Sequence, residues 1–129
     1  HRRERLLETM RAIEEYELGL SRLVLEGEGG QPGLLEVPGL TMYGPKTIPA
    51  RLGRDPTFTF KLAGYEDSVL SRLLYERYGL AVGAEDFFSR VPRLYGLETA
   101  VRATLVHYNT RADAIALVRA LHALAARTR

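Results

Sequence analysis

The ten residues Val101-Arg102-Ala103-Thr104-Leu105-Val106-His107-Tyr108-Asn109-Thr110 decide the fold of this 129-residue chain. Strict alternation predicts a strand over 101–108. One face of this strand is expected in the core and comprises Val101, Ala103, Leu105 and His107. The other face comprises Arg102, Thr104, Val106 and Tyr108, and so carries a guanidinium group.

The same stretch predicts the start of a helix. Asn109 is a turn residue, and Thr110 is suited to cap the helix that follows. Asp113 stands three residues later, where a capping box places an acidic side chain. A strand, a tight corner and a helix therefore follow one another here.

Apolar spacing predicts two more helices. A lead-in helix over 1–27 has no capping residue before it, which favours a chain cut from a longer protein. Its apolar positions are Leu6, Met10, Ile13, Leu20 and Val24. A second helix is expected over 66–78, and Gly79 stands where a left-handed C-cap belongs.

Further strands are expected at 40–43, 57–62 and 80–82, with glycine-rich 27–39 as a loop and 83–89 leaving the sheet. The order helix, strand, strand, helix, strand, strand, helix predicts an α+β fold. We expect a small antiparallel or mixed sheet of about four strands covered by helices. The domain proper is expected at 28–129, after the lead-in helix, within a single domain 1–129.

Composition excludes several classes of protein. The chain is 46% hydrophobic and 26% charged, as in an ordinary globular domain, and has no apolar run of about 18 residues. We therefore expect a soluble, cytoplasmic protein that does not bind membranes. Nucleic-acid binding is not expected either, because the basic residues are interleaved with glutamates along the first helix. Cysteine is absent, and His107 and His122 lack metal-ligand spacing, so no metal site is expected.

Several segments, taken in order, resemble the C-terminal small domain of class V aminotransferase-like pyridoxal-phosphate enzymes, including the cysteine desulfurase-like proteins. The resemblance covers nearly the whole chain and rests on an ordered set of segments: the lead-in helix with Ile13, Tyr16 and Leu20, the turn Tyr43-Gly44-Pro45, the strand Pro56-Thr57-Phe58-Thr59-Phe60, the step Tyr78-Gly79-Leu80-Ala81-Val82, and the segment 102–110. It implies the α+β small domain of fold-type I pyridoxal-phosphate enzymes. It also implies a parent enzyme that is a homodimer and acts on an amino acid.

The resemblance implies that Arg102 binds the α-carboxylate of the substrate. A planar guanidinium can donate two parallel hydrogen bonds to a carboxylate, which an ammonium cannot. From alternation alone, the competing interpretation is a surface arginine paired with a glutamate.

The segment 85–88 corresponds to a loop that approaches the active site in this family, so Asp86 and Phe88 are candidate substrate contacts. In the desulfurases this loop carries a cysteine that accepts sulfur, and Phe88 stands in its place here. Persulfide chemistry is therefore disfavoured. The alternative for Phe87 and Phe88 is a hydrophobic plug under the loop.

The resemblance places the cofactor's Schiff-base lysine, acidic partner and phosphate cup upstream of this segment. Lys46 and Lys61 match none of those positions, so we expect the chain alone to hold no pyridoxal phosphate and to catalyse nothing. The reaction type of the parent, a transferase or a lyase, stays open. The second hypothesis is a free-standing α+β binding or interaction module in which Arg102 binds a carboxylate ligand or nothing.

Overall fold

The computed structural model describes residues 1–48, 53–86, 88 and 90–128. The helices are α1 (Arg2–Glu26), α2 (Asp67–Tyr78), α3 (Arg90–Leu94) and α4 (Arg111–Ala125), with 3-10 turns η1 (Leu34–Glu36) and η2 (Ala126–Thr128). The strands are β1 (Gly27–Glu28), β2 (Gln31–Pro32), β3 (Leu40–Tyr43), β4 (Thr57–Leu62), β5 (Gly83–Glu85) and β6 (Ala100–Thr104).

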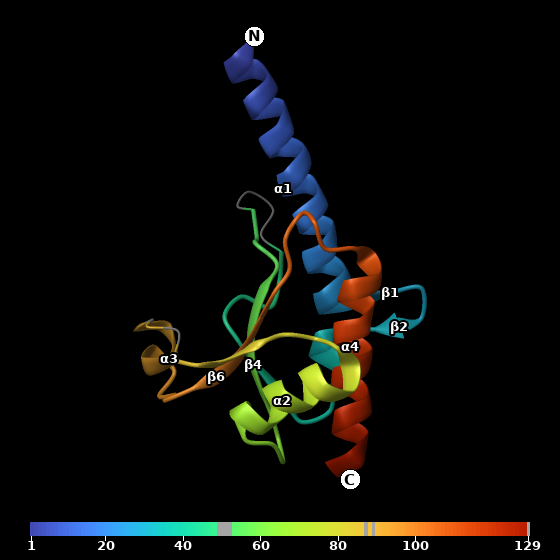
Figure 1. Ribbon diagram of the computed structural model, residues 1–129, viewed down its shortest axis with the longest axis vertical. Coiled ribbons are helices and arrows are strands. Elements are labelled where there is room, and N and C mark those ends of the chain that lie inside the picture. The colour runs from blue at the N-terminus through green and yellow to red at the C-terminus, as the bar shows by residue number, and fades with distance from the viewer. Residues whose placement is uncertain (49–52, 87, 89, 129) are drawn as a thin grey trace.

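Four strands form one antiparallel sheet in the order β3-β4-β6-β5, and β1 pairs with β2 in a separate hairpin. Helices α1, α2 and α4 lie on one side of the sheet, whereas the short α3 lies away from α1 and α4 (Figure 1). The expected α+β fold, a four-stranded sheet covered by helices, is confirmed.

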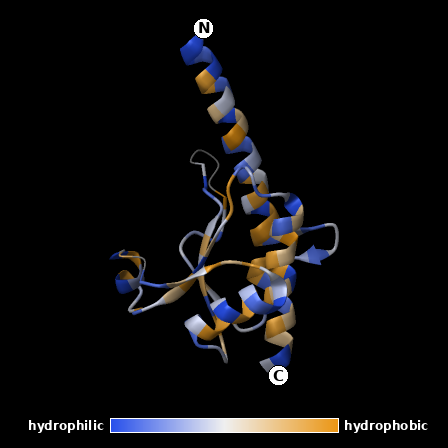
Figure 2. Cartoon of the chain, in the orientation of Figure 1, coloured by the Kyte–Doolittle hydropathy of each residue, from blue (hydrophilic) through white to orange (hydrophobic). Residues whose placement is uncertain are grey.

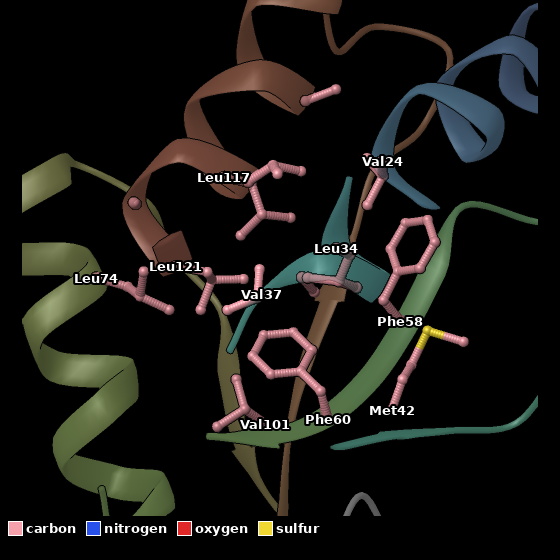
Figure 3. Close-up of a cluster of buried hydrophobic side chains, with 14 of the residues drawn as sticks. Val24, Leu34, Val37, Met42, Phe58, Phe60, Leu74, Val101, Leu117 and Leu121 are labelled. Atoms are coloured by element: carbon pink, nitrogen blue, oxygen red, sulfur yellow. The ribbon is translucent and has the colours of Figure 1, made fainter. Parts of the chain in front are cut away.

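The core forms between the sheet and these helices because alternate residues of the central strands are apolar. Phe58 and Phe60 of β4 are fully buried, and opposite them in register lie Ala103 and Val101 of β6. Leucines of α4 and α2, together with Val24 of α1, pack against these strand residues from the helical layer (Figure 3). Each large side chain buried in this way contributes about 1.5–3 kcal/mol relative to exposure.

Helix α1 contributes buried side chains to this core only near its C-terminal end, from Leu20 onward. The apolar side chains nearer its start are exposed, Leu6 by 56% and Met10 by 59%. Figure 2 shows the N-terminal part of α1 extending beyond the rest of the domain, with apolar and polar residues interspersed along it. The spacing predicts the helix correctly, but its first apolar positions have no cover among the described residues.

The prediction for the end of the opening strand is wrong. Strand β6 ends at Thr104, and the side chain of His107, expected in the core, is 54% exposed. The reason is the turn, in which Asn109 Oδ1 accepts a hydrogen bond from the Val106 N–H at 2.9 Å. The His107 N–H then donates to Glu17 of α1 at 2.9 Å.

The prediction of a strand at 80–82 is also wrong. The observed strand β5 begins at Gly83, within the segment 83–89 expected to leave the sheet. Helix α2 holds the earlier residues away from the sheet. The Leu80 N–H donates to the Leu74 carbonyl, and the Ser71 hydroxyl donates to the Val82 carbonyl at 2.7 Å. The loop expected at 27–39 likewise contains the β1–β2 hairpin and η1.

The predicted helix ends are confirmed. Gly79 follows α2 with φ 68°, in the left-handed region. At the start of α4, the Thr110 hydroxyl accepts from the Asp113 N–H at 3.2 Å, and Asp113 Oδ2 accepts from the Thr110 N–H at 2.7 Å. Both halves of the capping box are therefore present.

The capping box predicts a pH-dependent stability. The hydrogen bond from the Thr110 backbone, followed by that from its hydroxyl, lowers the pKa of Asp113. The carboxylate therefore stabilises the fold above the usual aspartate pKa of about 4, and this stabilisation is lost as the pH falls through the lower pKa of the folded state. Asp113→Asn should destabilise the protein at neutral pH, by less as the pH approaches 2–3.

The measurement is urea unfolding of wild type and Asp113→Asn across this pH range, with the exposed Glu98→Gln as the control variant. A difference between wild type and Asp113→Asn that does not change with pH would contradict the predicted role of the carboxylate.

Candidate functional site

Arg102 lies on β6, an inner strand of the sheet, with its side chain exposed on the face turned away from the core. Its neighbours in sequence, Val101 and Ala103, are buried, which fixes the backbone on both sides of it. Thr59 of β4 and Gly83 of β5 flank it in register. The predicted orientation of Arg102 is thus confirmed, whereas its role stays a prediction.

Two rows of residues paired across the strands lie on this face, which we call the Arg102 face. The first row runs Tyr43, Thr59, Arg102, Gly83 across the four strands. In the second row Thr57 lies opposite Thr104, and their hydroxyl oxygens are 3.3 Å apart.

Tyr95 lies at the Tyr43 end of the first row. The two rings meet edge to face with their centroids 5.3 Å apart, so the segment after α3 covers this end of the Arg102 face. The region beside Arg102 is therefore bounded by aromatic rings on one side, and Gly83 offers no side chain on the other. The sequence places Thr104 on the same face as Arg102 by alternation, but it does not predict Tyr43 as a neighbour, because only the strand register brings Tyr43 onto this face.

Arg102 is itself engaged in a contact within the protein. A guanidinium carries five N–H donors, so one such group can serve more than one acceptor. The competing interpretation, a surface arginine held by a glutamate, is not tested by the geometry of the sheet.

Asp86 and Phe88 lie beyond the end of β5, the edge strand next to Arg102. Gly83 is opposite Arg102, and β5 runs from there toward the start of β6, so Asp86 is about 10 Å along the strand from that row. The Asp86 carboxylate accepts from the Phe88 N–H at 3.0 Å. The structure therefore brings Asp86 and Phe88 close to each other, just beyond the end of β5.

Phe88 is 97% exposed and has a φ of 51°, in the left-handed region that non-glycine residues seldom adopt. It is not a plug beneath the loop in this chain, so that alternative is wrong for Phe88. Phe87 lies outside the described residues.

The lysines do not fit a pyridoxal-phosphate site. Lys61 Nζ lies 2.5 Å from Oδ2 of Asp67, a buried carboxylate that also accepts from the Thr99 hydroxyl at 2.6 Å. Lys61 is thus held in an ion pair that joins β4 to the start of α2. Lys46 is an exposed loop residue. That neither lysine serves the cofactor stays a prediction.

His107 and His122 are likewise bound in structural contacts: His122 Nε2 lies 3.1 Å from the Gly33 carbonyl, and His107 is near Glu17. Among the described residues, no three His, Cys, Asp or Glu side chains gather to hold a metal ion. None of the helices described has the length and apolar character needed to cross a bilayer.

A cleft of about 250 Å³ opens between 79–82 and β6, where the expected strand is absent. Asn109 and Asp113 line it, but both side chains already serve the turn and the helix cap. Arg102 does not line this cleft, so we place the candidate site on the Arg102 face instead.

The sequence matches no family profile, and no curated protein matches it. Among solved structures, the chain is similar to the cysteine desulfurase CsdA from Escherichia coli, with a TM-score of 0.66 and 24% sequence identity. The similarity covers 89% of this chain and 25% of the CsdA chain, so this chain spans about a quarter of that protein's length. At this identity the comparison confirms the fold that the family resemblance implied.

The ion pair of Lys61 with Asp67 predicts that Lys61 matters more than Lys46 for the stability of the fold. Lys61→Met should lower the free energy of unfolding by roughly 1–3 kcal/mol, because it leaves the buried Asp67 carboxylate without its cation. Lys46→Met, in an exposed loop, should change it by less than about 0.5 kcal/mol. Urea unfolding at pH 7 compares the two variants, and equal stabilities would contradict the structural role of Lys61.

Proposed function

We propose that this chain is the small domain of a pyridoxal-phosphate-dependent enzyme of the class V aminotransferase and cysteine desulfurase-like type. In this proposal the enzyme acts on an amino acid, and Arg102 binds the α-carboxylate of the substrate. The observation that carries the proposal is the position of Arg102 on the open face of an inner strand, in a fold similar to part of a cysteine desulfurase.

The surroundings of Arg102 suit it to this task. Because Val101 and Ala103 are anchored in the core, the Cα of Arg102 has a fixed position from which its planar side chain can meet a carboxylate with two hydrogen bonds. A charge-assisted hydrogen bond contributes about 1.5–3 kcal/mol. The absence of a side chain at Gly83 leaves room on one side for a ligand.

The remaining parts of an active site would come from the rest of a longer protein. Lys61 is committed to Asp67, and Lys46 lies in a loop, so the cofactor would be held by residues outside this chain. The chain alone would then be inactive. The absence of cysteine argues against a persulfide at the Phe88 position, and so against sulfur transfer by that route. The resemblance also supports a cytoplasmic homodimer.

The test uses the longer protein encoded by the complete reading frame. With pyridoxal phosphate it should show Schiff-base absorbance, and Arg102→Lys should weaken amino-acid binding roughly tenfold or more, because one of two parallel hydrogen bonds is lost. Cofactor absorbance should be unchanged. Spectral titration with amino acids measures both quantities.

Arg72→Lys, an exposed arginine on α2, is the matched control and should bind amino acids as wild type does. Unchanged binding in Arg102→Lys would refute the role of Arg102. Absence of Schiff-base absorbance would refute the enzyme and leave the free-standing binding module as the remaining hypothesis.

A further inference from the structure

The second row of the Arg102 face carries a pair of hydroxyl groups close to the proposed carboxylate site. Thr104 is two residues from Arg102 on the same strand and face, a separation of about 7 Å. Thr57 lies directly opposite Thr104 on β4. A small ligand with two polar ends can therefore contact Arg102 and this pair together.

The two hydroxyls have hydrogen-bonding capacity to spare. The Thr57 hydroxyl is 3.3 Å from that of Thr104, longer than the usual 2.5–3.0 Å of an O–H···O bond. Each hydroxyl can donate one hydrogen bond and accept two. Because threonine is β-branched, both side chains have restricted χ1 angles on their strands. The pair is thus a pre-positioned donor for an incoming oxygen atom.

Two arginines lie near this end of the sheet, one on each face. Arg54 donates through Nη2 to the Thr57 carbonyl at 3.3 Å and through Nη1 to the Pro45 carbonyl. The Arg54 guanidinium, however, lies over the ring of Phe58 on the core face of β4, so it is Arg102 in the neighbouring row that carries positive charge on the face of the hydroxyl pair. This arrangement favours a ligand oxygen that is negative or strongly electron-rich.

We infer that Thr57 and Thr104 form a second subsite that selects amino acids whose side chains end in a carboxylate or carboxamide. The inference rests on the proposed function, since Arg102 would hold the α-carboxylate while the Thr104 hydroxyl donates to the side-chain oxygen. The subsite discriminates by a hydrogen bond that an apolar side chain cannot make.

The test is an NMR titration of the 129-residue chain with propionate, which has one carboxylate, and glutarate, which has two. Both ligands should shift the Arg102 resonances, and only glutarate should also shift Thr57 and Thr104. Glutarate should bind roughly three- to tenfold more tightly, the ratio expected for one added hydrogen bond.

Thr104→Val removes the hydroxyl with little change of shape, so it should abolish the preference for glutarate while leaving propionate binding intact. Thr104→Ser should keep the preference. Thr41→Val, an exposed threonine on β3, is the matched control and should behave as wild type. Thermal unfolding verifies that each variant is folded.

The outcomes separate the two proposals. If propionate shifts Arg102 but glutarate binds no better, or if Thr104→Val keeps the preference, the second subsite is refuted while the role of Arg102 stands. If neither ligand shifts Arg102, the second subsite and the carboxylate-binding role of Arg102 are both overturned, while the Schiff-base absorbance of the longer protein still tests the enzyme.

Discussion

The rest of the structure depends on the pairing of β4 with β6. Phe58 and Phe60 are buried opposite Ala103 and Val101, and a shift of this register by one residue would turn both rings out of the core. Burial of these side chains therefore fixes the positions of the residues between them. Arg102 and Thr104 are held on the opposite face by the same constraint, so the geometry of the candidate site is set by the core rather than by contacts within the site.

The ion pair of Lys61 with Asp67 adds a second constraint at the end of β4. Asp67 is 6% exposed and receives the Thr99 hydroxyl as well as the Lys61 ammonium, so one carboxylate links β4, the segment before β6 and the first turn of α2. A buried carboxylate needs such partners, because an unpaired charge in the interior is costly. The lysine most easily mistaken for a reactive group is thus part of the framework.

The sequence predicts those parts of the fold in which local pattern and burial agree. Alternation over 57–62 and the capping box at Thr110 are confirmed because short-range chemistry decides them. The failures at 80–82 and His107 have tertiary causes, since contacts with α2 hold the first away from β6 and the Asn109 turn directs the second toward Glu17. For the candidate site, alternation predicts that Arg102 and Thr104 share a face, but only register shows that Tyr43, Thr59 and Gly83 lie in the row of Arg102.

The exposure of Arg102 has a further physical consequence for the proposed role. An exposed guanidinium binds a carboxylate weakly, since water competes for both partners and the high dielectric constant reduces their attraction. The same pair would be several-fold stronger in a site from which water is excluded. A sheet face that carries a fixed and exposed cation, ordered hydroxyls and a glycine gap, with Tyr95 over its Tyr43 end, is therefore suited to one half of a site. The strength of binding would then depend on the surface that closes over it.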